Sequence, residues 1–75
     1  MSVSAMKMNK KYIDERGWQY AVRPVLGEYV YIVMRRMAGE RWKQAHVLPW
    51  FANKQAAEDE LERWAAEKGM KCMEG

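Results

Sequence analysis

Apolar and polar residues alternate along much of the chain before residue 49. A period of two, rich in aromatic and β-branched residues, is typical of strands that bury one side. The pattern predicts three strands, over residues 18–23, 28–37 and 41–48. The middle strand has bulky residues on both sides, which favours a central place in the sheet.

Short breaks separate the predicted strands. Pro24 is expected to end the first strand, because proline cannot donate a hydrogen bond to a ladder, and residues 24–27 are expected to form the hairpin loop. Ala38-Gly39 marks a second turn, and Pro49 ends the third strand. Connections this short make sequential strands neighbours, so an antiparallel meander is predicted.

After residue 53 the apolar residues recur at helical spacing. Asn53 is a suitable N-cap, since its side chain can accept a hydrogen bond from an early helical N–H, and Gly69 is the expected C′ residue. The apolar stripe between them consists of Ala57, Leu61, Trp64 and Ala65. A helix of about four turns needs a packing partner. The predicted fold is therefore α+β, a three-stranded antiparallel sheet packed on one C-terminal helix (β-β-β-α).

Strand parity divides the sheet into a face under the helix and an open face. The face against Leu61 and Trp64 is expected to hold Val30, Ile32, Met34, Ala45 and Val47. The open face then carries Tyr29, Tyr31, Arg35, Trp42, Gln44 and His46. Gln19 and Arg23 join the open face if Trp18 faces the helix. Both parities of the first strand remain open, because Trp18 and Tyr20 suit a core or an aromatic surface.

The chain length of 75 residues has room for one domain. Residues 12–69 are expected to form it, between a flexible N-terminal tail over residues 1–11 and a C-terminal tail over residues 70–75. Cys72 is the single cysteine, so no internal disulfide can form. No apolar run approaches the ~20 residues of a membrane span, and no signal peptide is recognisable. The sequence therefore predicts a cytoplasmic protein without a membrane partner.

Charge is unevenly distributed within a net charge of +3. Residues 1–48 carry nine Lys/Arg and four Asp/Glu, which gives +5. Residues 54–68 carry three Lys/Arg and five Asp/Glu, which gives −2. The acidic side chains Glu58, Asp59, Glu62 and Glu67 are expected on the solvated outer face of the helix. A basic sheet region beside an acidic helix steers anionic partners to one side of the molecule.

Motifs for catalysis and metal binding are missing from the sequence. His46 and Cys72 do not have the spacing of metal ligands. No Gly-rich phosphate loop, paired-carboxylate spacing or nucleophile motif occurs. The sequence therefore predicts a non-enzymatic protein that uses neither a cofactor nor a metal.

Aromatic and basic residues together make the open face and its rim a candidate nucleic-acid-binding surface. Aromatic rings can stack on bases, Arg and Lys neutralise phosphates, and Gln can contact a base edge. The candidate residues are Arg23, Tyr29, Tyr31, Arg35, Arg36, Arg41, Trp42, Lys43 and Gln44.

Two other interpretations fit the same residues. The rings can fill ordinary cross-strand pairs, and the charges of Arg41 and Lys43 can protect an edge strand from aggregation. A protein-interaction module is the alternative function, in which an apolar patch binds a protein partner or a second copy. That patch would consist of Tyr29, Tyr31, Val33 and Trp42.

The order of these elements resembles the arm-type DNA-binding domain of phage and conjugative-transposon integrases. The resemblance covers roughly residues 16–68 and rests on Gly17-Trp18-x-Tyr20, Gly39-x-Arg41, Phe51, Asn53-Lys54, Ala57 and Leu61. It implies that the open face of a three-stranded sheet enters the major groove of DNA, with strand residues and loop arginines in contact. The second strand is apolar where the family is basic, and Pro49-Trp50 replaces a Gly-rich approach to Phe51. The resemblance implies a small bacterial or phage protein, an accessory protein of a phage or mobile element.

Overall fold

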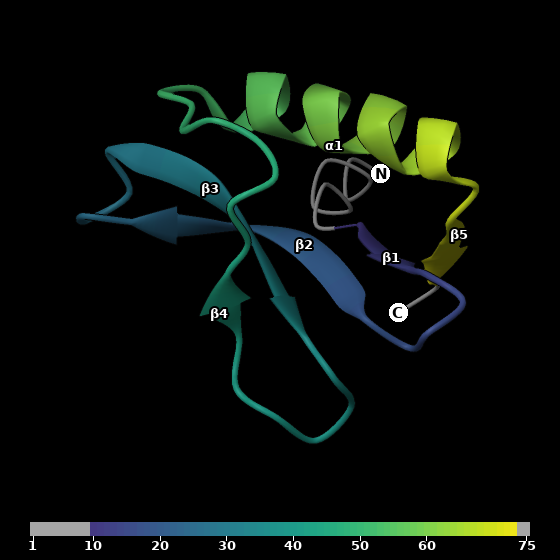
Figure 1. Ribbon diagram of the computed structural model, residues 1–75. Helices are drawn as coiled ribbons and strands as arrows, with labels where there is room; N and C mark the ends of the chain where they lie inside the picture. Colours follow the sequence, from purple (N-terminus) through teal and green to yellow (C-terminus); the bar gives the residue numbers. More distant parts are fainter. Residues whose placement is uncertain (1–9, 74–75) are drawn as a thin grey trace, which may run out of the picture.

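One helix lies across one face of a five-stranded antiparallel sheet in the computed structural model, which describes residues 10–73 (Figure 1). The strands pair in the order β4-β3-β2-β1-β5. The elements are β1 (Lys11–Ile13), β2 (Gln19–Val25), β3 (Val30–Arg36), β4 (Lys43–Gln44), α1 (Lys54–Lys68) and β5 (Lys71–Met73). The α+β class with one C-terminal helix on an antiparallel sheet is confirmed, whereas the described residues form five strands instead of the predicted three.

The β2–β3 hairpin is the longest part of the sheet and runs in register from the Gln19–Arg36 pair to the Val25–Val30 pair. Pro24 lies within β2 and does not end it, so that prediction was wrong. Pro24 pairs with Tyr31, whose own N–H and C=O bond to Phe51 on the far side of β3. Pro24 therefore occupies a non-hydrogen-bonded position, and its missing N–H faces an edge that β1 does not reach. Proline is tolerated at such an edge.

The turn of this hairpin spans residues 26–29, two residues later than the loop predicted at 24–27. Glu28 N–H donates to the Val25 carbonyl at 3.1 Å, and Tyr29 N–H donates to the Leu26 carbonyl at 3.2 Å. Leu26, Gly27 and Glu28 all have positive φ angles, of 53°, 66° and 72°. Consecutive left-handed residues match the twist of a tight hairpin, although Leu26 and Glu28 adopt that conformation at a steric cost.

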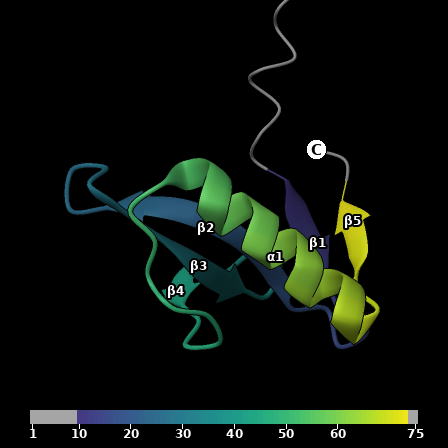
Figure 2. The same ribbon diagram turned by 90° about the horizontal axis from the view of Figure 1, so that it is seen from above.

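β1 and β5 were not predicted, because strands of three residues show too little periodicity to detect. Tyr12 pairs with Tyr20 of β2 on one side and with Cys72 of β5 on the other. Residues 71–73 are thus a strand and not part of a tail, and Lys11 belongs to β1. Residues 1–9 of the tail predicted over residues 1–11 lie outside the described residues. Figure 2 shows α1 leading directly into β5 beside β1.

The strand predicted over residues 41–48 is mostly irregular, since only Lys43–Gln44 pairs with β3 as a strand. Ala45 N–H still donates to the Val33 carbonyl at 3.0 Å. Residues 46–50 then leave the sheet edge, and the chain returns where Phe51 and Tyr31 exchange two hydrogen bonds of 2.7 and 2.9 Å. The edge of β3 is therefore hydrogen-bonded to the chain both before and after the loop formed by residues 46–50.

The core lies between α1 and one face of the sheet. It consists of Tyr12, Tyr20, Val22, Val33, Ala45, Ala57, Leu61 and Ala65. The rings of Tyr20 and Trp64 meet edge to face with centroids 5.1 Å apart. Tyr20 of β2 therefore faces the helix, and Trp18, just before β2, also packs against this core. The predicted helical stripe is confirmed, as are the N-cap bond from Ala56 N–H to Asn53 Oδ1 and the left-handed Gly69 after the last turn.

The parity predicted for β3 was wrong. Val33 is 1% exposed and pairs with Val22 under the helix. Val30, Ile32 and Met34 alternate with it and so belong to the opposite face. The sequence could not decide this parity, because both sides of β3 carry large apolar residues. Val47, also predicted in the core, is exposed in the loop after β4.

Candidate nucleic-acid interface

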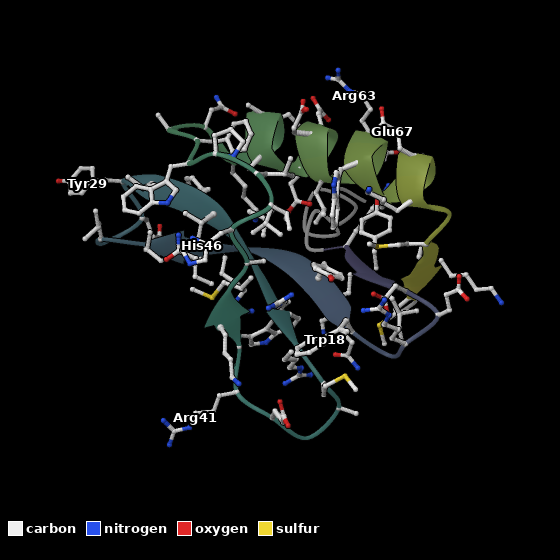
Figure 3. All side chains as sticks on the ribbon, in the orientation of Figure 1. Trp18, Tyr29, Arg41, His46, Arg63 and Glu67 are labelled. Carbon is white, nitrogen blue, oxygen red and sulfur yellow. The ribbon has the colours of Figure 1, made fainter. Side chains whose placement is uncertain are left out.

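The structure separates the predicted site residues into distinct regions. The face of the sheet away from α1, here called the helix-free face, holds Arg23, Arg36, Trp42 and Gln44. Tyr31, Arg35 and Lys43 have the opposite parity, because Tyr31 packs against the core and Lys43 pairs with Arg35. Tyr29 lies at the tip of the β2–β3 hairpin, and Arg41 lies in the loop before β4 (Figure 3). The placement of Tyr29, Tyr31 and Arg35 on the open face was therefore wrong, and that of Trp42 and Gln44 was correct.

Two arginines from neighbouring strands converge on one tryptophan of the helix-free face. The guanidinium carbon of Arg36 lies 4.6 Å from the centroid of the Trp42 ring, and that of Arg23 lies 5.8 Å from it. Both distances are within the range of cation–π attraction. Gln19 belongs to the same group, because Arg36 Nε donates to Gln19 Oε1 at 3.0 Å. These four residues, Gln19, Arg23, Arg36 and Trp42, are called the Trp42 cluster below.

Sheet register explains how this cluster forms. Arg36 lies opposite Gln19, Arg23 lies opposite Ile32, and the Ala21–Met34 pair lies between those two pairs. The guanidinium groups of Arg23 and Arg36 reach the same ring from the two ends of this stretch. Ala21, in the middle of this stretch, is 3% exposed. The register therefore brings Arg23 and Arg36 to the same side of the sheet as Trp42.

Arg36 is the most restrained basic side chain of the cluster. Its Nε bond goes to Gln19, which is buried, and its Nη1 lies 3.5 Å from the Glu40 carbonyl at the limit of hydrogen bonding. Arg23 is exposed at the side of the cluster nearer the hairpin tip. Gln19 was predicted on this face only for one parity of the first predicted strand. The stacking of both arginines on Trp42 was not predicted, because it depends on the register between three strands.

The remaining candidates are less available for stacking on a base. Tyr31 is held at the sheet edge by its bridge to Phe51 and packs against the core. Arg35 lies over the ring of Trp18, with its guanidinium carbon 4.7 Å from the ring centroid. Tyr29 is 80% exposed but lies at the hairpin tip, away from the Trp42 cluster. The predicted aromatic and basic residues therefore do not all share one face of the sheet.

The apolar patch predicted for a protein partner is not assembled either, since Val33 is buried and Tyr31 packs inward. Large apolar side chains are instead exposed on two loops. Leu26 and Tyr29 belong to the β2–β3 turn, and Val47 and Trp50 belong to the loop between β4 and α1.

Glu58 was predicted on the solvated outer face of α1, and that prediction was wrong. Its side chain is 7% exposed and faces the core, and its Oε2 has no hydrogen-bond partner among the described residues. Burial raises the pKa of Glu58 from 4.5 to about 7, opposed by Lys54 and then Lys10, while Asp59 raises it further. Helical spacing from Glu58 to Leu61 and Ala65 was a signal for this orientation. Arg63 and Glu67, in contrast, extend from the side of α1 away from the sheet (Figure 3).

Tyr12 of β1 lies close enough to Glu58 for the two groups to interact electrostatically. Burial raises the pKa of the Tyr12 hydroxyl to about 12, with Glu62, Cys72 and Glu58 adding to the effect. Two open hollows occur in the described structure, of about 550 and about 340 Å³. Glu58 and Tyr12 line neither of these two hollows.

Within residues 10–73, no group of three or more His, Cys, Asp or Glu side chains is arranged to hold a metal ion. None of the helices in that range combines the length and apolarity needed to cross a membrane. Comparisons with protein-family models, curated proteins and solved structures found no match to this chain. The resemblance to the integrase arm-type domain therefore stays a prediction from the sequence.

Proposed function

We propose that the protein is a small, non-enzymatic DNA-binding module of the cytoplasm that contacts DNA through the helix-free face of its sheet. The observation that carries this proposal is the convergence of Arg23 and Arg36 on Trp42. Two guanidinium groups that lie against one ring bring positive charge together for a polyanion. The resemblance to the integrase arm-type domain supports the same face and favours an accessory role in a phage or mobile element.

The charge of the rest of the molecule supports this orientation. Residues 1–48, which supply the first four strands, carry a net charge of +5, whereas residues 54–68 of α1 carry −2. A DNA duplex is therefore attracted to the strand segment of the chain and repelled by α1. The helix therefore serves as a support and does not enter a groove.

Direct binding measurements test this proposal. Fluorescence anisotropy or mobility shift at low salt is expected to show binding of duplex DNA that weakens steeply as salt rises. A double variant, Arg23→Gln with Arg36→Gln, is expected to lower affinity by about tenfold or more. The matched control is Arg63→Gln with Lys68→Gln, which removes the same charge from α1 and is expected to change affinity little. If wild-type protein binds no DNA or RNA at low salt, nucleic-acid binding is refuted.

A protein-interaction module is the second candidate function, favoured by the exposure of Leu26, Tyr29 and Trp50. Exposed apolar patches are typical of protein interfaces. Size-exclusion chromatography with light scattering tests the self-associating form of this hypothesis. A dimer that persists in high salt and dissociates in a Tyr29→Ser variant supports it, and a monomer at high protein concentration contradicts it.

A further inference from the structure

We propose that the Trp42 cluster is a phosphate clamp for the backbone of duplex DNA. In this clamp Arg23 and Arg36 contact phosphates, and Trp42 and Gln19 hold the two arginine side chains in position. This inference rests on the proposed DNA-binding function and specifies how the helix-free face would engage its ligand. It assigns Trp42 a supporting role, in contrast to the base-stacking role that an aromatic residue on a sheet first suggests.

The ring of Trp42 already makes cation–π contacts within the protein. Arg36 and Arg23 both lie over the ring, at 4.6 and 5.8 Å from its centroid. A base that stacks on the ring face held by a guanidinium group must displace that group, and its cation–π contact is lost. Single-strand binding by stacking needs an accessible ring, and this ring is committed to other contacts.

The guanidinium group of Arg36 is oriented by the hydrogen bond that its Nε makes. Nε donates to Gln19 Oε1 at 3.0 Å, and Gln19 is itself buried and therefore restrained. Nη1 has one long contact of 3.5 Å to the Glu40 carbonyl, and Nη2 has no hydrogen-bond partner among the described residues. A planar guanidinium group restrained in this way presents its outer donors in the geometry that a phosphate accepts.

Restrained donors favour a ligand whose acceptors are also ordered. A side chain that is fixed before binding loses less conformational entropy on association. The phosphates of a duplex are regularly spaced, whereas those of a single strand must be ordered by the protein. The Trp42 cluster therefore favours duplex over single-stranded DNA and contacts the backbone without reading base sequence.

The experiment measures affinity for a labelled mixed-sequence duplex and for one of its strands, from about 50 to about 200 mM salt. Arg23→Gln and Arg36→Gln are each expected to reduce the slope of log affinity against log salt by about 0.9 on the duplex. The matched control Arg63→Gln, on the far side of α1, is expected to leave the slope unchanged. Wild-type protein is expected to bind duplex more tightly than the single strand.

Variants of Trp42 separate positioning from stacking without changing charge. Trp42→Leu is expected to lower duplex affinity about fivefold, and Trp42→Phe, which keeps a ring under both guanidinium groups, is expected to restore most of it. Far-UV circular dichroism and urea denaturation verify that each variant is folded. Tighter binding of the single strand, with selective loss in Trp42→Leu, would show that the indole stacks on bases and would overturn the clamp.

The clamp and the DNA-binding function can fail separately. If wild-type protein binds duplex DNA but the slopes of Arg23→Gln and Arg36→Gln equal that of Arg63→Gln, the clamp is wrong and DNA binding stands. If wild-type protein binds neither form of DNA, both proposals fall together.

Discussion

Burial of Glu58 predicts that the stability of this protein decreases as pH rises, and replacement of this residue tests the packing of α1 directly. The side chain is 7% exposed, and its Oε2 has no hydrogen-bond partner within residues 10–73. Ionisation at that position is unfavourable because a charge loses its hydration there. Glu58→Gln removes the ionisable group while preserving the shape of the side chain.

The magnitude follows from the pKa of Glu58, which rises from 4.5 to about 7 on folding. The folded protein holds this proton more tightly than the unfolded chain does. The corresponding stability is fully present below about pH 4.5 and is lost as pH rises through about 7. The loss amounts to about 3 kcal/mol, a large fraction of the stability of a small domain. Because a buried amide also needs hydrogen bonds, we expect Glu58→Gln to gain about 1–3 kcal/mol over wild type at pH 8.

Urea denaturation followed by tryptophan fluorescence, between pH 4 and pH 9, measures this effect as the free energy of unfolding. The difference between Glu58→Gln and wild type is expected to be small at pH 4 and to grow towards pH 8. Glu67→Gln is the matched control, since Glu67 is exposed on the opposite side of the same helix. A difference that is constant across the pH range, or equal for the two variants, would refute the burial of Glu58 as an ionisable group.

Three further substitutions test the turn, the cap and the core, each by urea denaturation. Leu26→Gly relieves a left-handed residue with φ of 53° and is expected to stabilise the protein by about 1 kcal/mol; a loss of stability would contradict the turn geometry. Asn53→Ala removes the 3.0 Å bond from Ala56 N–H and is expected to cost about 1 kcal/mol, with Asn53→Ser retaining most of it. Leu61→Ala, at a fully buried position, is expected to cost about 3 kcal/mol, and a cost below about 1 kcal/mol would exclude a tight core there.

Local signals in the sequence determined the helix almost completely. Asn53 and Gly69 define its two ends through hydrogen bonds with nearby backbone groups, and these bonds depend little on the rest of the fold. Strand formation in the β2–β3 hairpin was also predictable, because alternation and β-branched residues are local properties. The predicted strand boundaries were less accurate. Pro24 was expected to end β2, but it is tolerated within that strand because β1 pairs only with residues 19–21.

The candidate site was predictable in composition but not in arrangement. Arg23, Arg36 and Trp42 were all among the predicted residues, yet their convergence depends on the register of β2 against β3 and on the path of the chain before β4. Tyr31 and Arg35 were assigned to the wrong face for the same reason. Alternation shows which residues share a side of a strand, but it does not show which side meets the helix.

The sequence by itself determined the α+β class, both helix ends, the hairpin and the separation of basic and acidic segments. Only the tertiary structure decided the face of β3, the pairing of β1 with β5, the burial of Glu58 and the stacking of two arginines on Trp42. The physical reason is the range of the interactions. Caps and periodicity arise among residues a few positions apart, whereas faces, edges and side-chain clusters arise from contacts between segments far apart in the chain.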